Sequence, residues 1–380
     1  MGVNTLFLIP GEVGGSETYL RDILRHAIPR HPDLEWILFT NDENHALLQS
    51  ELGRFPGVSL HSLHFSARSR VARIVREQTQ LPLAARGLRL DVLWSPGYTA
   101  PCYAPCAQVA SVLDMQYREF PEDFSPAALW ATRLLVPVAI RVSRQVITLS
   151  EFSRTQIVRY VKVSPDTIRV IYPAVDAVFG NPMPAEERFC RLANLVPSGA
   201  YILCVANTYP HKNVHVLIEA FGALSAGTDC RLVLVGGEGR GEPLVQDRLR
   251  GLKVRDRVIR LRRLARADLV ALYQGAACFA FPSLYEGFGL PVLEAMAAGT
   301  PVVASSCGAV KEIGGEAIAY VDGSATQLAC AVKDVLELGE VEKLRIVAQA
   351  KRRALSFTWE RAADETVACL RDAAKGSVPR

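Results

Sequence analysis

The sequence has no run of about 20 uninterrupted apolar residues, which is the length that a membrane-spanning helix requires. It also begins without a basic segment followed by a long apolar core, so we expect no signal peptide. The formal net charge is only +4, and this small excess does not by itself indicate a nucleic-acid-binding protein.

Cysteines are few and odd in number. The chain has nine, most of them within apolar stretches. This usage is typical of reduced, packed thiols in a cytoplasmic protein and not of a disulfide framework. Cys102 and Cys106 lie close together, but no histidine or carboxylate pattern completes a zinc site around them. We therefore expect a cytoplasmic protein without a bound metal.

The chain of 380 residues is too long for one ordinary hydrophobic core, so we expect two domains. Apolar segments of strand length alternate with helical or loop segments, which predicts α/β domains with mostly parallel sheets covered by helices on both faces. The turn-rich residues 180–184 are the best linker candidate. The expected strands are 5–9, 36–40, 58–63, 92–95, 108–113, 146–149 and 168–172 in the first half, and 201–205, 231–235, 258–261, 276–281, 301–304 and 318–321 in the second.

One stretch, residues 282–304, carries the strongest chemical pattern. It places a glycine loop directly after an expected strand and before a helix that can begin at Leu290 or Pro291. Proline suits the first helical turn, and the amides at a helix N-terminus form an anion site. Glu286 lies in the loop and Glu294 in the helix, so a phosphate would be flanked by two carboxylates that can accept hydrogen bonds from sugar hydroxyls. The alternative is an ordinary strand–loop–helix unit with both glutamates facing solvent.

A second glycine loop follows the first apolar segment of the chain. Gly14 and Gly15 precede a stretch with apolar residues at helical spacing, which is typical of the opening of a doubly wound sheet. These glycines allow the backbone to approach a ligand closely, although a tight turn alone would also use them.

Three further residues stand where expected strands end. Asp114 follows the apolar segment 108–113, at the edge where open α/β sheets bind ligands. Ser150 is a natural helix N-cap, and we expect it to cap the helix that follows. Lys212 lies at a loop-to-helix junction, where its ammonium group can meet a diphosphate as a point charge. The alternative is an ordinary lysine on the solvated surface.

The long run Pro-Ser-x-x-Glu-Gly-Phe-Gly-Leu-Pro-x-Leu-Glu-Ala-Met-Ala-x-Gly-Thr-Pro-Val-Val, residues 282–303, resembles the Glu-x7-Glu motif of the retaining GT-B glycosyltransferases of the family-4 type (glycosyl transferases group 1). The resemblance extends over essentially the whole chain and is weakest between about residues 40 and 90. It implies a GT-B fold, with two Rossmann-like domains facing a central cleft. Residues 1–178 would form the acceptor-side domain and residues 179–358 the nucleotide-sugar domain. A helix within residues 359–380 would return to the first domain.

The resemblance also implies roles for individual residues. Glu286 would hold hydroxyls of the donor sugar and Glu294 those of the ribose, while Lys212 would meet the diphosphate. Asp114 and Ser150 would line the acceptor side, and Asp114 would join Glu286 and Lys212 as the catalytic residues. The implied donor-binding set is Gly14, Gly15, Asn207, Lys212, Glu286, Gly287, Phe288, Gly289, Leu290 and Glu294.

The sequence departs from the family pattern at three positions. Leu113 stands where many members have a histidine before the aspartate, and this histidine lies near the transferred sugar or the acceptor in relatives. Ala206 replaces a glycine, and His211 replaces the arginine of the Pro-Arg-Lys-Asn segment. The Leu113 replacement bears on the activity, or at least on the sugar preference.

The implied activity is transfer of a hexose from a nucleotide-diphosphate sugar to a glycan or lipid-linked acceptor, with retention, in cell-surface polysaccharide synthesis of a mannosyl or rhamnosyl type. The sequence has no Asp-x-Asp motif, so we expect no metal cofactor. Lys212, loop amides and the helix dipole would stabilise the leaving group instead. The alternatives are a nucleotide-sugar epimerase of the same fold and a two-lobed sugar-binding protein. A dinucleotide dehydrogenase is disfavoured because the first loop lacks Gly-x-Gly-x-x-Gly.

A basic segment lies between residues 61 and 90, with six arginines and a single acidic residue, Glu77. The simplest interpretation is a solvated helix face. The alternative is a surface for an anionic acceptor or for lipid headgroups at the inner face of the cell membrane. The residues we expect at that surface are Arg68, Arg70, Arg73 and Arg76.

Overall fold

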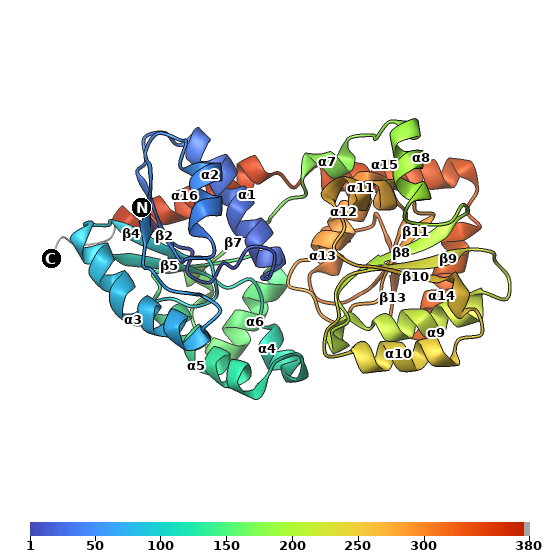
Figure 1. Cartoon of the computed structure of the whole chain (residues 1–380), viewed down its shortest axis with the longest axis horizontal. Helices are drawn as coiled ribbons and strands as arrows, with labels where there is room; N and C mark the ends of the chain where they lie inside the picture. Colours follow the sequence, from blue (N-terminus) through green and yellow to red (C-terminus); the bar gives the residue numbers. More distant parts are fainter. Residues whose placement is uncertain (376–380) are drawn as a thin grey trace. The chain divides into compact units, whose positions relative to one another are not determined.

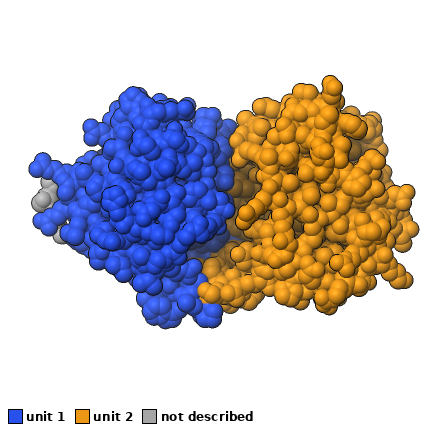
Figure 2. Space-filling view, in the orientation of Figure 1, with its two compact units in different colours: residues 1–115, 126–173, 358–380 blue, residues 116–125, 174–357 orange. Residues whose placement is uncertain are grey.

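The structure is a computed structural model that describes residues 1–375. It consists of two compact units, drawn in different colours in Figure 2. Residues 1–115, 126–173 and 358–380 are assigned to unit 1, and residues 116–125 and 174–357 to unit 2. The chain was expected to divide after residues 178 and 358, and the units divide after Pro173 and Phe357. Residues 116–125, which were expected in the first domain, belong to unit 2. Residues 376–380 of the expected C-terminal segment lie outside the described residues.

Within residues 1–375, unit 1 contains a seven-stranded parallel sheet, ordered β3-β2-β1-β4-β5-β6-β7. Helices cover both faces of this sheet (Figure 1), as expected for strands that are buried on both sides. The strands are β1 Gly2–Asn4, β2 Trp36–Thr40, β3 Val58–Ser62, β4 Val92–Ser95, β5 Ala107–Ser111, β6 Gln145–Thr148 and β7 Ile168–Val170. The helices are α1 Gly15–Arg30, α2 His45–Leu52, α3 Arg70–Gly87, α5 Pro126–Val142, α6 Glu151–Val161 and α16 Trp359–Lys375.

Within the same described range, unit 2 contains a six-stranded parallel sheet, ordered β10-β9-β8-β11-β12-β13. Its strands are β8 Tyr201–Val205, β9 Arg231–Val235, β10 Val258–Leu261, β11 Cys278–Phe281, β12 Val302–Ser305 and β13 Ala319–Val321. The helices are α4 Gln116–Glu119, α7 Ala177–Gly180, α8 Ala185–Ala193, α9 Val214–Leu224, α10 Glu242–Gly251, α11 Arg266–Gly275, α12 Leu290–Ala298, α13 Val310–Gly314, α14 Ala325–Leu336 and α15 Glu340–Ala354. Unit 2 also has short 3-10 turns at η1 Pro121–Asp123, η3 Pro210–Lys212 and η4 Arg255–Arg257, whereas η2 Pro165–Thr167 lies in unit 1.

The prediction of two doubly wound, parallel α/β domains is confirmed. Most strands match the expected ranges with shifts of a residue or two at their ends, which is the usual uncertainty of such boundaries. The first strand is the exception. The predicted strand 5–9 is wrong, because β1 comprises Gly2–Asn4 and the apolar residues that follow form a buried turn.

The side chains of Asn41 and Asn44 explain how that turn is buried. Their amide groups donate to the backbone carbonyls of Thr5, Leu6 and Leu8 at 2.8–3.1 Å. Carbonyls that would otherwise pair in a sheet are therefore satisfied by side chains. An apolar run alone cannot distinguish a buried strand from a buried turn that is held in this way.

The last described helix, α16, completes unit 1. Trp359, Leu370 and neighbouring small residues are buried where α16 packs against α1 and strands β4 and β5. The rim of this contact is polar, because Asp364 accepts from Arg30 and pairs with His31 at 3.0 Å. No helix among residues 1–375 is long and apolar enough to cross a membrane.

Candidate functional site

The strand order of unit 2 defines the place where a ligand is expected. Counted within that unit, the order is 3-2-1-4-5-6, and it reverses direction between β8 and β11. In open parallel sheets, ligands bind outside the carboxyl ends of the two strands at such a switch point. The loops that leave β8 and β11 carry Lys212 and Glu286, respectively. The topology therefore brings together two candidates that are far apart in sequence.

Lys212 and Glu286 form an ion pair at this point, with the lysine Nζ 2.6 Å from Glu286 Oε1. The Glu286 side chain is 10% exposed and the Lys212 side chain 21% exposed. The ammonium group also lies 5.8 Å from the centre of the Phe281 ring. A partly desolvated lysine in this position can bind an anion more strongly than a lysine on the open surface.

Helix α12 begins at Leu290, as expected, directly after the Glu286 loop. Gly289 caps it in the left-handed conformation with φ 105°, and Pro291 occupies the first turn. A glycine is required at this φ, and the proline lacks the amide that a first turn leaves unpaired. The N-terminal turn of α12 therefore directs backbone amides and the positive end of the helix dipole toward the Glu286 loop.

Gly308 supports the Glu286 loop from behind, and we did not predict this contact. Its φ is +49°, and a Cβ atom there would lie 2.4 Å from the Glu286 carbonyl oxygen. The next residue, Ala309, donates its amide to the same oxygen at 3.1 Å. Cys307 Sγ donates to the Ser283 carbonyl at 2.8 Å. The segment after β12 thus fixes the backbone of the Glu286 loop.

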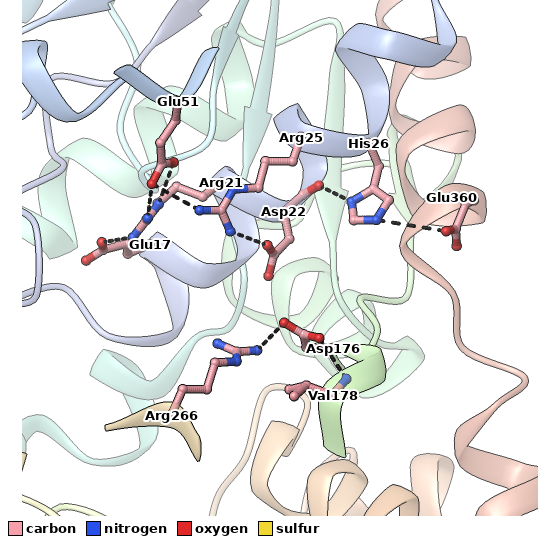
Figure 3. Close-up of polar contacts among 10 residues, drawn as sticks. All are labelled: Glu17, Arg21, Asp22, Arg25, His26, Glu51, Asp176, Val178, Arg266 and Glu360. Atoms are coloured by element: carbon pink, nitrogen blue, oxygen red, sulfur yellow. Dashed lines mark hydrogen bonds and ion pairs between the residues drawn. The ribbon is translucent and has the colours of Figure 1, made fainter. Parts of the chain in front are cut away.

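Glu294 lies on α12, where it accepts a 2.8 Å hydrogen bond from the hydroxyl of Tyr273. Burial raises the pKa of Glu294 to about 7, and the Tyr273 hydrogen bond and the charge of Arg266 oppose this rise. Arg266 is held 2.7 Å from Asp176, which also caps α7 by accepting from the amide of Val178 (Figure 3). Glu294 can therefore exchange a proton near neutral pH.

The other predicted donor-binding residues have structural partners. Asn207 Oδ1 accepts from the amide of Gly237 at 2.7 Å, which ties the loop after β8 to the glycine run after β9. The Phe288 ring is buried and packs edge-on against Phe357, with ring centres 5.9 Å apart. The Phe288 ring is thus part of the packing beneath the loop. Leu290 is partly exposed at the first turn of α12.

The remaining candidates lie in unit 1. Gly14 caps α1 with φ 61°, and Gly15 begins that helix. Both have open space where a Cβ would stand. Behind this loop, Glu17 accepts from the Gly11 amide at 2.7 Å. Glu17 also pairs with Arg21, which in turn pairs with Glu51 (Figure 3).

Asp114 and Ser150 follow β5 and β6 at the carboxyl edge of the unit 1 sheet, where the topology predicted them. Asp114 is partly exposed, and Leu113 before it is buried. Ser150 is fully buried, and its hydroxyl accepts from the Ser153 amide at 3.0 Å as the N-cap of α6. The capping role predicted for Ser150 is confirmed, while its buried side chain has no exposed atom to offer an acceptor.

The predicted basic surface is formed by the start of α3 and the residue before its cap. Arg68 and Arg70 are exposed, and Arg76 is partly exposed. Arg68 also pairs with Glu12 at 2.7 Å. Arg73 differs from these residues because it packs beside the buried Glu77, and burial lowers the pKa of its guanidinium group. Arg73 is therefore a poor candidate for surface contact.

Among residues 1–375, no group of three or more histidine, cysteine, aspartate or glutamate side chains is arranged to hold a metal ion.

Two contributors to the site carried no predicted role, namely Gly308 and Tyr273. Neither has a local sequence signal, because each acts through a residue that is distant along the chain.

Comparisons with known proteins agree with this geometry. Residues 193–353 match the family model "Glycosyl transferases group 1", and residues 13–179 match "Glycosyltransferase Family 4". The chain is 31% identical over 229 residues to the O-antigen chain mannosyltransferase B of Escherichia coli, which covers 59% of this chain and 60% of that protein. It is 33% identical over 244 residues to the MMP alpha-(1->4)-mannosyltransferase of Mycolicibacterium hassiacum. This match covers 60% of this chain and 54% of that protein. The matched segments thus span about half to three fifths of these curated relatives.

A solved structure supports the fold over nearly the full length. HepE of Anabaena in complex with UDP-glucose superposes with a TM-score of 0.75 at 22% identity, covering 97% of this chain and 99% of that one. The two family models together account for most of both units. The chain therefore belongs to the group 1, family-4 type of glycosyltransferases and has their GT-B fold.

Proposed function

We propose that the protein transfers a hexose from a nucleoside-diphosphate sugar to a glycan or glycolipid acceptor, with retention at the anomeric carbon. The observation that carries this proposal is the Lys212–Glu286 pair beside the N-terminus of α12, at the switch point of unit 2. A diphosphate needs positive charge and backbone amides, while a sugar needs hydrogen-bond acceptors. This site offers both. The names of the relatives favour a mannosyl or related transfer in cell-surface polysaccharide synthesis.

In this mechanism, Lys212 and the amides of the α12 N-terminus stabilise the diphosphate as its bond to the anomeric carbon breaks. Glu286 accepts from hydroxyls of the sugar, and Glu294 accepts from those of the ribose. Asp114, in unit 1, lines the acceptor side. The acceptor oxygen forms the new bond on the face that the diphosphate leaves, and a phosphate oxygen takes the acceptor proton. This same-face course requires no enzyme nucleophile, and trapping a covalent glycosyl-enzyme would contradict it.

A thermal-shift screen of GDP-, UDP-, dTDP- and ADP-sugars tests the donor assignment. A ligand that binds the folded state raises the melting temperature by mass action, so one nucleotide class should give a clear shift. We expect the shift and the subsequent turnover to persist in chelator, because the proposed site uses Lys212 and backbone amides in place of a metal. Loss of turnover in chelator would contradict metal independence. An isomerised donor formed without acceptor would favour an epimerase, and binding of a free sugar without any nucleotide would favour a sugar-binding protein.

The affinity for a nucleoside diphosphate should depend on pH through Glu294. The deprotonated carboxylate can accept from both ribose hydroxyls and is the stronger acceptor, and burial raises the pKa of Glu294 to about 7. As the pH falls below 7, binding must displace a proton, so affinity should fall by up to about tenfold per pH unit. Titration calorimetry between pH 6 and 8 measures this, with Glu294→Gln as the control that removes the titrating group. An equal pH dependence in the variant would contradict the assignment.

We also propose a peripheral contact of unit 1 with anionic membranes. The supporting surface is the start of α3, where Arg68, Arg70 and Arg76 adjoin the exposed Val71 and Val75. Basic and apolar side chains on one helix are the combination that binds an anionic lipid surface. This contact would place the protein at the inner face of the cell membrane, where a lipid-linked acceptor would be available.

Co-sedimentation with vesicles of anionic lipid tests the contact. Each basic residue near such a surface contributes about 1 kcal/mol, so Arg70→Glu with Arg76→Glu should weaken binding by more than about tenfold. The matched control is Arg250→Glu with Arg352→Glu, which makes the same charge change at exposed positions of unit 2. Equal losses in both variants, or no loss in the first, would exclude α3 as the contact.

A further inference from the structure

His211, the residue before Lys212, is buried in unit 2 with only 3% of its surface exposed. Its ring nitrogen Nδ1 lies 2.5 Å from Asp123 Oδ2. Its backbone carbonyl accepts from the amide of Leu284 at 2.7 Å and from the hydroxyl of Ser283 at 3.3 Å. His211 therefore connects three segments: the Lys212 turn, the loop that carries Glu286, and the segment that contains Asp123.

Asp123 belongs to the segment Gln116–Ser125, which is part of unit 2 although the chain on both sides of it belongs to unit 1. Gln116 donates to Asp123 Oδ2 at 2.7 Å and lies 3.2 Å from His211 Nδ1. Phe120 packs against both His211 and Tyr285, with ring centres 5.9 and 5.8 Å apart. The segment thus covers the Lys212 turn and the Glu286 loop with polar and aromatic contacts.

The His211–Asp123 pair is almost completely buried, with side-chain exposures of 4% and 1%. Asp123 Oδ1 accepts no hydrogen bond from the residues that the structure describes. Burying such a pair costs desolvation that its attraction repays only in part, so well-packed apolar side chains would often give equal stability. A buried pair of this kind is better explained by the fixed geometry it imposes than by the stability it adds.

We propose that His211 and Asp123 are positioning residues that hold Lys212 and the Glu286 loop in the geometry needed for transfer. This inference rests on the proposed function, because Lys212 is the group through which the pair acts. A directional pair on the preceding residue limits the rotation of the Lys212 turn. The contacts of the His211 carbonyl keep that turn in register with the loop that carries Glu286.

Kinetics of Asp123→Asn test the proposal. The variant keeps the size of the side chain and removes its charge. A displacement of about 1 Å at a reacting group can cost about 100-fold, so we expect kcat to fall by about 10- to 100-fold while the KM for the acceptor changes little. In a Lys212→Ala background the same substitution should have a clearly smaller effect, because only the displacement of the Glu286 loop remains. Additive losses in the double variant would overturn the proposal.

A second variant separates positioning from folding. Replacing the pair as Asp123→Leu with His211→Leu removes both buried polar groups together, which is the change that such sites tolerate best in stability. We expect a folded protein with kcat reduced as in Asp123→Asn. Full activity would show that the pair only fills space. The control is Asp268→Asn on α11, which weakens a 2.8 Å pair with Arg191 of α8 and should leave kcat unchanged.

Hydrogen–deuterium exchange provides a measurement that does not depend on catalysis. In ligand-free Asp123→Asn, exchange should increase in residues 116–125 and also in residues 209–213 and 283–287. An increase confined to residues 116–125 would contradict the positioning proposal, even if the wild-type protein proved to be an active transferase. Exchange could instead increase in all three segments while the wild-type protein binds no nucleoside-diphosphate sugar. That result would support the positioning of Lys212 and the Glu286 loop by the His211–Asp123 pair, and it would contradict only the proposed function.

Discussion

Lys212→Ala is expected to lower turnover by about 10²- to 10³-fold, the usual cost of removing one preorganised donor from the site of developing charge. The ammonium group lies at the switch point of unit 2 beside the α12 N-terminus, and its 21% exposure leaves it accessible to a phosphate. The loss should appear in kcat more than in the donor KM, because charge on the leaving diphosphate grows as the bond breaks. Steady-state kinetics with the donor identified by the screen measure both.

The matched control for this prediction is Lys311→Ala, which removes an exposed lysine from α13 in the same unit. It should leave kcat within about twofold of wild type, since surface substitutions of this kind rarely perturb a site. Lys212→Ala also leaves Glu286 without its partner, so its melting temperature must be recorded beside the kinetics. Unchanged turnover in a folded Lys212→Ala protein would remove the basis of the proposed mechanism.

Gly308→Ala is expected to damage both stability and turnover. The residue has a φ of +49°, where alanine costs about 1–2 kcal/mol, and the added Cβ would lie 2.4 Å from the Glu286 carbonyl oxygen. The clashing atom belongs to the backbone and cannot rotate away as the end of a flexible side chain can. The clash can therefore be relieved only by a shift of the Glu286 loop. A shift of about 1 Å would reduce kcat by about 100-fold. Chemical denaturation and kinetics on the same preparation measure the two effects.

Gly251→Ala is the control for Gly308→Ala. Gly251 ends helix α10, and a Cβ there would have nothing within 4 Å. Alanine is a better helix former than glycine by about 0.8–1.0 kcal/mol, so this variant should be as stable as wild type or slightly more so. If both variants behaved alike, the close approach of Gly308 to Glu286 would have no energetic consequence.

The parts of the fold that sequence patterns predicted are those determined by local chemistry. The strands Trp36–Thr40 and Tyr201–Val205 are short apolar runs with clear ends, and α12 begins where Gly289 and Pro291 indicate. The turn at residues 5–9 was mistaken for a strand because Asn41 and Asn44, which stabilise it, come more than 30 residues later. A pattern read over a few neighbouring residues contains no information about such distant partners.

The same distinction applies to the site. Glu286 and Glu294 were selected as candidates because the motif that contains them is continuous and specific, and Lys212 because its segment resembles the Pro-Arg-Lys-Asn pattern. The residues that support them were not recognised, because their contacts are distant in sequence. Tyr273 contacts Glu294 21 positions away, Gly308 contacts Glu286 22 positions away, and Asp123 contacts His211 88 positions away. His211 was noted only as a replacement for an arginine, and the structure shows that its ring faces Asp123. Residue types that bind ligands are visible in a sequence, whereas residues that hold them in place are not.

The discontinuity of unit 1 has a consequence for the synthesis of the protein. Its sheet is finished at β7, yet α16, which covers α1 and strands β4 and β5, is encoded almost two hundred residues later. During synthesis on the ribosome, the surface of unit 1 that α16 covers would therefore stay exposed until the whole of unit 2 has emerged. Unit 2 requires only residues 116–125 from an earlier part of the chain, and these have already been synthesised, so unit 2 can fold first. Domains commonly fold in the order of their synthesis, whereas we expect this chain to complete unit 2 before unit 1.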